Sequence, residues 1–121
     1  LCAIAEGLTA AIAAHRPHAV AVEDLFHHKN ARSALVLGHA RGVALLVAAQ
    51  AGLAVHAYAP ALVKRTVAGK GSATKEPVAR LVGAILQLEI DVPNDETAAL
   101  AVALTHVQPA PMARSRSRKP R

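Results

Sequence analysis

Two acidic residues, Glu23 and Asp95, occupy positions from which carboxylates could reach a catalytic site. Glu23 ends a short apolar run typical of a strand, and Asp95 opens a run with helical character. An acid at a strand tip and another in the first turn of a helix can converge in space. Such carboxylates are hard ligands for Mg²⁺ or Mn²⁺, which can activate water for phosphodiester hydrolysis. Asp95 is equally explained as ordinary charge at a helix N-terminus.

A basic, glycine-spaced segment between Lys64 and Lys75 is a second candidate site. Glycines let the backbone approach an anion, and lysines neutralise it, so the segment resembles a phosphate-binding strip. Its letters GKGSATK do not have the spacing of a P-loop. The alternative interpretation is a solvated surface loop.

Other kinds of site are poorly supported by the residue spacing. The seven histidines lack zinc-finger spacing, and Cys2, the single cysteine, cannot form an internal disulfide, which favours a reducing, cytoplasmic setting. We expect no membrane span, because no run of about 18 residues is free of charge and glycine. No secretory signal is visible, and because the sequence opens with Leu1 we expect it to begin inside its gene.

The basic character of the chain is concentrated at its C-terminal end. The net charge is +6, and five of the fourteen lysines and arginines lie between Arg114 and Arg121. We expect residues 109–121 to form a disordered basic tail that either attracts polyanions or is simply solvated. Residues 1–108 suit a single domain. Only 2% of residues are aromatic, so the core must be aliphatic.

Hydrophobic periodicity predicts the elements that would position these residues. We expect helices over residues 1–15, 31–51, 60–67, 75–88 and 94–107, and strands over 19–22 and 53–58. Asn30 and Thr74 are the expected caps of the second and fourth helices. The order strand, helix, strand predicts a parallel crossover and an α/β fold, with the first strand buried on both faces.

Three blocks of the sequence resemble successive segments of the RuvC family of Holliday-junction resolvases. They read VAVEDLFHHKNARSALVLGHARGVALL, VKRTVAGKGSATKEPV and ALAVALTHVQ. The resemblance implies a ribonuclease-H-like fold, a mixed sheet flanked by helices. It also implies a homodimeric, metal-dependent endonuclease that nicks four-way DNA junctions symmetrically in recombination and repair. Two Mg²⁺ or Mn²⁺ ions per site and a branch-migration motor of the RuvA and RuvB type are further implications.

The resemblance also assigns DNA-binding residues. Phe26 is similar to an aromatic residue that stacks on bases near the junction centre, although a core ring is the alternative. Lys64 and Lys75 match basic residues near the scissile phosphate. Lys29 and Asn30, in the same segment as Phe26, complete the predicted set.

For catalysis, Glu23 resembles the family's second acid, and Asp95 the acid that opens its final helix. The family pattern there is D-x-x-D-A-L, but this chain has Ala98 at the second acidic position. Glu96 is a poor substitute, because it points about 100° away from Asp95 on a helix. No counterpart of the family's opening strand, G-I-D-P-G, is present, so we expect the first three strands and the first catalytic acid to be absent.

The hypothesis is therefore a truncated, inactive form of a junction resolvase, with an exposed strand edge prone to aggregation or partner pairing. A non-catalytic, dimeric junction-binding module is the rival function. A second rival is a ribonuclease-H-like enzyme acting on RNA–DNA hybrids, which the Phe26 segment and the basic block disfavour.

Overall fold

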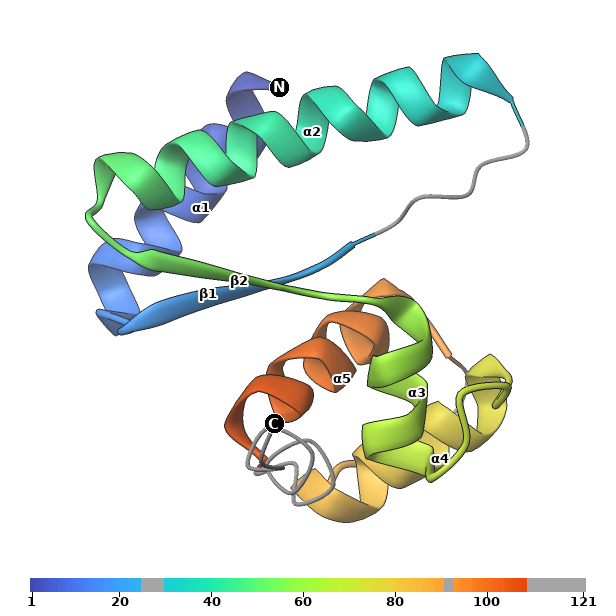
Figure 1. Ribbon diagram of the computed structural model, residues 1–121. Helices are drawn as coiled ribbons and strands as arrows, with labels where there is room; N and C mark the ends of the chain where they lie inside the picture. Colours follow the sequence, from blue (N-terminus) through green and yellow to red (C-terminus); the bar gives the residue numbers. More distant parts are fainter. Residues whose placement is uncertain (25–29, 91–92, 109–121) are drawn as a thin grey trace, which may run out of the picture. The chain divides into compact units, whose positions relative to one another are not determined.

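The computed structural model describes residues 1–24, 30–90 and 93–108 (Figure 1). The chain divides into two compact units, Leu1–Ala57 and Tyr58–Arg121. The predicted tail, residues 109–121, lies outside the described residues. In chain order the elements are α1 (Cys2–His15), β1 (Ala19–Glu23), α2 (Ala31–Gln50), β2 (Ala54–Tyr58), α3 (Pro60–Ala68), α4 (Lys75–Leu86) and α5 (Asp95–Val107).

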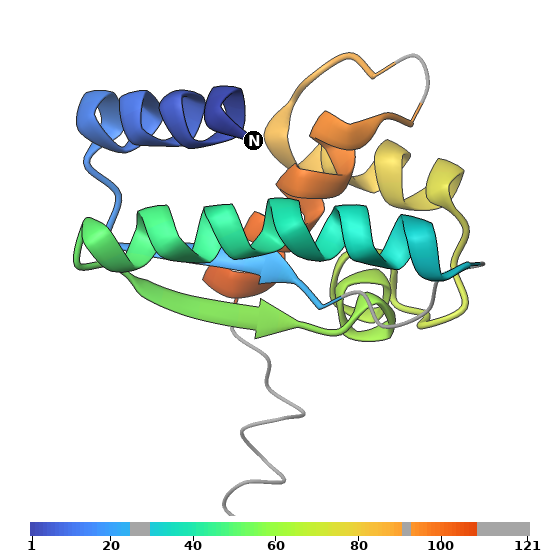
Figure 2. The ribbon, with the colours of Figure 1, turned by 90° about the horizontal axis from the view of Figure 1, so that it is seen from above.

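The sheet of the first unit consists of β1 paired with β2. The two strands run in the same direction (Figure 2), with α2 as the connection between them, which confirms the predicted parallel crossover and α/β class. All five residues of β1 are only half-buried, so the expectation of burial on both faces is wrong. The reason is that the sheet has two strands in the described part of the chain, which leaves each strand with an unpaired edge.

The ends of α2 follow local sequence signals. The side chain of Asn30 accepts a hydrogen bond of 2.8 Å from the backbone N–H of Ser33, which confirms its predicted capping role. At the other end, Gly52 adopts a φ of 74°, in the left-handed region, and the N–H of Leu53 bonds to the carbonyl of Ala48. This arrangement satisfies the last carbonyls of the helix and turns the chain into β2.

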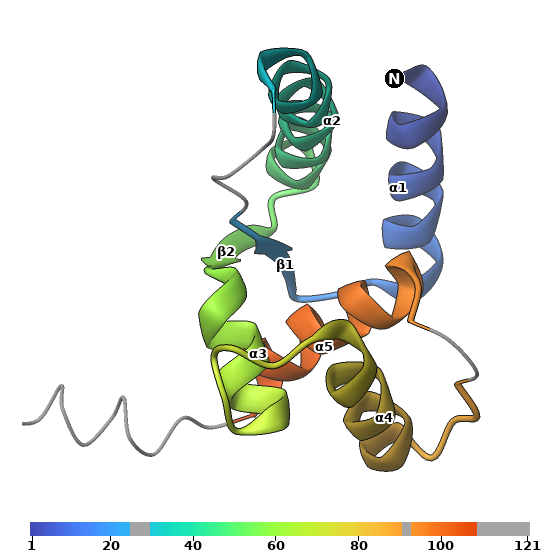
Figure 3. The same ribbon diagram turned by 90° about the vertical axis from the view of Figure 1, so that its right-hand side faces the viewer.

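Helix α2 packs alongside α1 in the first unit (Figure 3). By length and composition α2 could cross a membrane, contrary to the expectation of no membrane span, but a single helix of this kind is weak evidence. Its charged residue Arg41 forms an ion pair of 3.0 Å with Asp24, just after β1. A helix held in this way belongs to the layer that covers the strands.

The second unit is built from α3, α4 and α5, each of which packs against the other two. Its buried apolar residues are all aliphatic, as the shortage of aromatic residues predicts. They include Val63, Val67, Ala79, Val82, Ala101, Val102 and Leu104. Thr105 is buried as well, and its hydroxyl donates to the carbonyl of Ala101, so its polar atom does not oppose burial.

Helix α4 ends earlier than predicted, and two of its large apolar side chains are exposed. Leu81 and Ile85 are 38% and 42% exposed, whereas Val82 and Gly83 are buried. Gln87 takes a left-handed φ of 58°, and the N–H of Leu88 bonds to the carbonyl of Gly83 at 2.8 Å. The chain therefore folds back over Gly83 instead of continuing the helix through Leu88.

Replacement of Gly83 by alanine should destabilise the protein. An added Cβ would lie 2.9 Å from the carbonyl oxygen of Leu88, a backbone atom that cannot swing away as a flexible side chain can. We expect Gly83→Ala to lower the free energy of unfolding by about 1–3 kcal/mol, as overpacking does. The measurement is urea denaturation followed by circular dichroism.

Gly38→Ala is the matched control for Gly83→Ala. Gly38 is also helical, but nothing lies within 4 Å of its added Cβ. This change should raise the free energy of unfolding by about 0.5–1 kcal/mol through helix propensity. Equal effects of the two substitutions would contradict the packing described for Gly83.

Candidate functional site

Glu23 is the last residue of β1 and is half-buried. It takes part in an interaction of its own, so it is not a free carboxylate. The next residue, Asp24, is engaged by Arg41 of α2, with 31% of its side chain exposed. The strand end thus carries two consecutive acids, each of which already takes part in an interaction.

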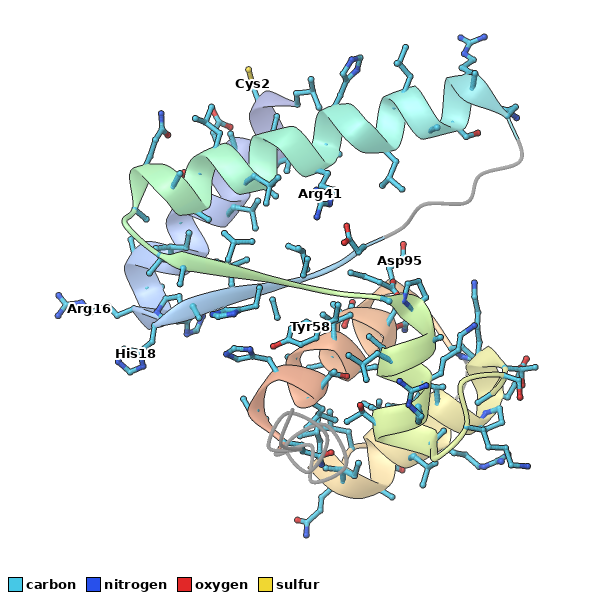
Figure 4. All side chains as sticks on the ribbon, viewed as in Figure 1. Cys2, Arg16, His18, Arg41, Tyr58 and Asp95 are labelled. Atoms are coloured by element: carbon cyan, nitrogen blue, oxygen red, sulfur yellow. The ribbon has the colours of Figure 1, made fainter. Side chains whose placement is uncertain are left out.

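Asp95 is the first residue of α5 and is exposed (Figure 4). Asn94 caps the helix by accepting a 2.8 Å hydrogen bond from the N–H of Thr97, and the hydroxyl of Thr97 accepts one from the N–H of Asn94. This reciprocal capping box fixes the direction in which the chain enters α5. Asp95 and Glu96 add favourable negative charge at that helix end.

Glu96 and Asp95 face different surroundings. Glu96 lines a hollow of about 380 Å³, together with Leu88, Ile90 and Leu100, whereas Asp95 does not line it. This difference agrees with the expectation that neighbouring residues on a helix point in different directions. Ala98 is exposed and has no oxygen to offer a metal. Asp95 therefore has no acidic companion one turn along its own face.

The donor chemistry fits a hard divalent cation, but the number of donors is low. Carboxylate oxygens such as those of Glu23 and Asp95 suit Mg²⁺ or Mn²⁺. Within residues 1–24, 30–90 and 93–108, no three His, Cys, Asp or Glu side chains come together in a way that could hold an ion. Glu23 belongs to the first unit and Asp95 to the second. Their convergence stays a prediction.

The predicted basic residues Lys64 and Lys75 both belong to the second unit. Lys64 is half-buried on α3, and Lys75 is the exposed first residue of α4. The segment between them begins at Gly69, whose φ of 81° ends α3. Gly71 lies close to α3, as shown by the distance of 3.4 Å that an added Cβ would have from the carbonyl oxygen of Ala61. The glycine-spaced strip is thus a loop held against α3.

The remaining predicted DNA-binding residues precede α2. Phe26 and Lys29 lie outside the described residues, so their roles stay predictions. Asn30 is described, and its side-chain oxygen is occupied by capping of α2. Its amide nitrogen is the group left to donate to DNA.

Sequence reasoning missed two long-range polar contacts. One is the ion pair between Arg41 and Asp24. The other joins the hydroxyl of Tyr58, at the end of β2, to Nδ1 of His106, in the last turn of α5. No local spacing could have revealed the second pair, because its members are 48 residues apart in the chain.

Comparison with known proteins gives a consistent result. Residues 1–106 match the family model described as crossover junction endodeoxyribonuclease RuvC. The protein of that description from Myxococcus xanthus is 54% identical over an alignment of 120 positions, which covers 93% of this chain and 63% of the relative. The corresponding protein from Sorangium cellulosum is 49% identical, with 91% of this chain and 62% of the relative covered.

Solved structures agree with this match. The Thermus thermophilus RuvC structure is 42% identical, with a TM-score of 0.77, over 85% of this chain and 63% of that one. T. thermophilus RuvC in complex with Holliday junction substrate is 40% identical, with a TM-score of 0.79 and the same coverage. The ribonuclease-H-like fold is thereby confirmed. This chain spans a little under two thirds of the length of the relatives it matches.

The capping box that presents Asp95 can be tested by substitution. Asn94→Ala removes the acceptor for the N–H of Thr97, so we expect it to lower the free energy of unfolding by about 1 kcal/mol. Thr74→Ala is the control, because Thr74 occupies the same position before α4 but makes no side-chain capping bond. It should change the stability by much less. Thermal and urea unfolding measure both, and equal losses would contradict the box.

Proposed function

Because this chain belongs to the RuvC family of crossover junction endodeoxyribonucleases, we propose that it serves the resolution of four-way (Holliday) DNA junctions by phosphodiester hydrolysis. The observation that carries the proposal is the likeness to T. thermophilus RuvC in complex with Holliday junction substrate, which extends over 85% of this chain. A cytoplasmic role in recombination and repair accords with that chemistry.

In the proposed mechanism, Glu23 and Asp95 are metal ligands. Their carboxylates would hold two Mg²⁺ ions, or Mn²⁺ in their place, and the bound metal would supply an activated water and stabilise the leaving oxygen. The capping box of α5 keeps Asp95 at the helix N-terminus. Helix α2 and the parallel pairing with β2 keep Glu23 at the end of β1.

The DNA would be held mainly by the second unit and by the segment that follows Glu23. Lys64 and Lys75 neutralise phosphates on either side of the glycine-spaced loop. Phe26 stacks on a base near the junction centre, while Lys29 and the amide nitrogen of Asn30 contact the backbone close by.

We further propose that residues 1–121 bind junctions without cleaving them. The support for this proposal is Ala98, which supplies no ligand atom at the position where the family pattern has its second acid. A non-catalytic, dimeric junction-binding module is the second candidate function, and Ala98 is the observation that favours it.

Helix α2 is the proposed surface for a homodimer. Leu35 and Val36 are 64% and 62% exposed in its N-terminal half, where Val36 also lines a hollow of about 420 Å³ beside Arg32. Burial of such apolar area stabilises association. A branch-migration motor of the RuvA and RuvB type is the further partner that the family suggests.

A gel-shift and nicking assay tests the proposed activity. The protein is mixed with a labelled synthetic four-way junction, with linear duplex as competitor and with or without Mg²⁺. We expect selective junction binding and no paired nicks. Paired nicks would contradict inactivity, and equal affinity for duplex would contradict junction recognition.

The same assay examines the two lysines. Lys64→Gln and Lys75→Gln should each weaken binding and reduce the slope of log K against log salt by about 1, as expected for one phosphate contact. Arg80→Gln is the control, because Arg80 lies five residues after Lys75 on α4 and so points to a different side of the helix. A slope unchanged by the lysine substitutions would contradict their role.

The dimer is tested by sedimentation velocity. Leu35→Glu places a charge on the exposed face of α2, so we expect it to shift the protein from dimer to monomer. Leu88→Glu is the control, since Leu88 is 50% exposed but lies in the second unit. Monomeric wild-type protein at all concentrations would rule out the proposed dimer.

A further inference from the structure

The contact between Arg41 and Asp24 lies directly beside the proposed metal ligand. Nη2 of Arg41 is 3.0 Å from Oδ1 of Asp24, and the two side chains are 35% and 31% exposed. Figure 4 shows the Arg41 side chain extending from α2 toward the strands. The pair therefore ties the middle of α2 to the residue that follows β1.

Asp24 is an obvious competitor for any cation bound at Glu23. The two residues are consecutive, and both carry the carboxylate oxygens that divalent ions prefer. A metal ion and a guanidinium cannot both use the same carboxylate without repulsion between the cations. The ion pair with Arg41 therefore makes Asp24 a poor metal ligand.

The orientation of the two side chains is a second reason to expect that Glu23 and Asp24 differ as metal ligands. Consecutive side chains in an extended segment point to opposite sides. Because Arg41 holds Asp24 toward α2, we expect Glu23 to point to the other side if the chain stays extended through Asp24. The ion pair also compensates the negative charge of Asp24.

The Arg41 side chain is not optimised for hydrogen bonding. Its Nε is buried and finds no partner among the described residues. A buried donor without an acceptor is unfavourable, and an aliphatic side chain of similar size would avoid that cost. Stability alone is thus a poor explanation for an arginine here.

We propose that Arg41 is a positioning residue that keeps Asp24 out of the metal site and leaves Glu23 as the carboxylate presented by β1. The inference rests on the proposed function, in which Glu23 is a metal ligand. It adds a specificity role for a residue on α2 that does not itself touch the metal or the DNA.

The test measures Mn²⁺ binding by NMR instead of nuclease activity. Carboxyl carbons of Glu23 and Asp24 are observed in residues 1–121 while Mn²⁺ is added, because the paramagnetic ion broadens signals close to it. The variants are Arg41→Gln, Arg41→Lys and the double variant Arg41→Gln with Asp24→Asn. Arg16→Gln is the matched control, since it removes the same charge from an exposed position of the first unit.

In the wild-type chain, Glu23 should broaden more than Asp24. Arg41→Gln should increase the Mn²⁺ affinity of Asp24 on the order of tenfold, because a unit positive charge next to that carboxylate is removed. Arg41→Lys should retain the wild-type pattern, because a single-point contact can be made by an ammonium. Arg16→Gln should retain it as well, and the double variant should leave broadening at Glu23 only.

Two failures can be told apart. If Arg41→Gln has the wild-type circular dichroism spectrum but Asp24 gains no broadening, the role of Arg41 is overturned. If Glu23 shows no broadening in the wild-type chain, the metal site of the proposed function is overturned, whereas a gain at Asp24 in Arg41→Gln still supports the positioning role. Should Arg41→Gln fail to fold, Arg41→Leu replaces it, because an aliphatic side chain leaves no buried donor unpaired.

Discussion

The parallel pairing of β1 with β2 is the constraint on which the first unit depends. Parallel strands cannot be joined by a tight turn, so the chain must cross between them through a long connection. That connection contains α2, whose 20 residues span roughly 30 Å at the rise of an α-helix. The five-residue strands span only about 17 Å. The helix is therefore longer than the sheet it covers, which explains why Val47 and Ala48 are buried near its C-terminal end, whereas Leu35 and Val36 are exposed near its N-terminal end.

Features set by neighbouring residues could be predicted from the sequence. The cap at Asn30 depends on a contact within three residues, and the apolar spacing that predicted the helices and strands is likewise a local pattern. The C-terminal end of α4, in contrast, could not be predicted from local contacts. Apolar spacing alone predicted a helix over residues 75–88, but the chain reverses over Gly83. Such a reversal depends on close approach of the backbone and not on the hydrophobic period. The position of Thr74 before α4 was also correct, yet its side chain makes no capping bond.

The candidate site shows the same difference between local features, which the sequence predicts, and long-range contacts, which it does not. The types of Glu23, Asp95, Lys64 and Lys75, and the absence of an acid at Ala98, can be read directly from the sequence. The partner of Asp24 cannot, because Arg41 lies 17 residues away and nothing in its neighbourhood distinguishes it from a solvated arginine. Only the pairing of strand and helix brings the two together. Site residues are thus predictable as chemical types, whereas the residues that orient them depend on tertiary structure.

The N-terminal end of α5 is stabilised by groups of the chain itself, so its folding does not depend on metal binding. Asp95 and Glu96 sit at the positive end of the helix dipole, where negative charge is stabilising without any ion. The capping box between Asn94 and Thr97 satisfies backbone donors at the same end. The helix therefore does not require a metal in order to form. A second acid at position 98 would lie one turn from Asp95 and add repulsion that a bound cation would relieve. With Ala98 that repulsion is absent, and so is the carboxylate that could bind a metal. The helix is therefore stable without a cation, and its affinity for a cation depends on Asp95.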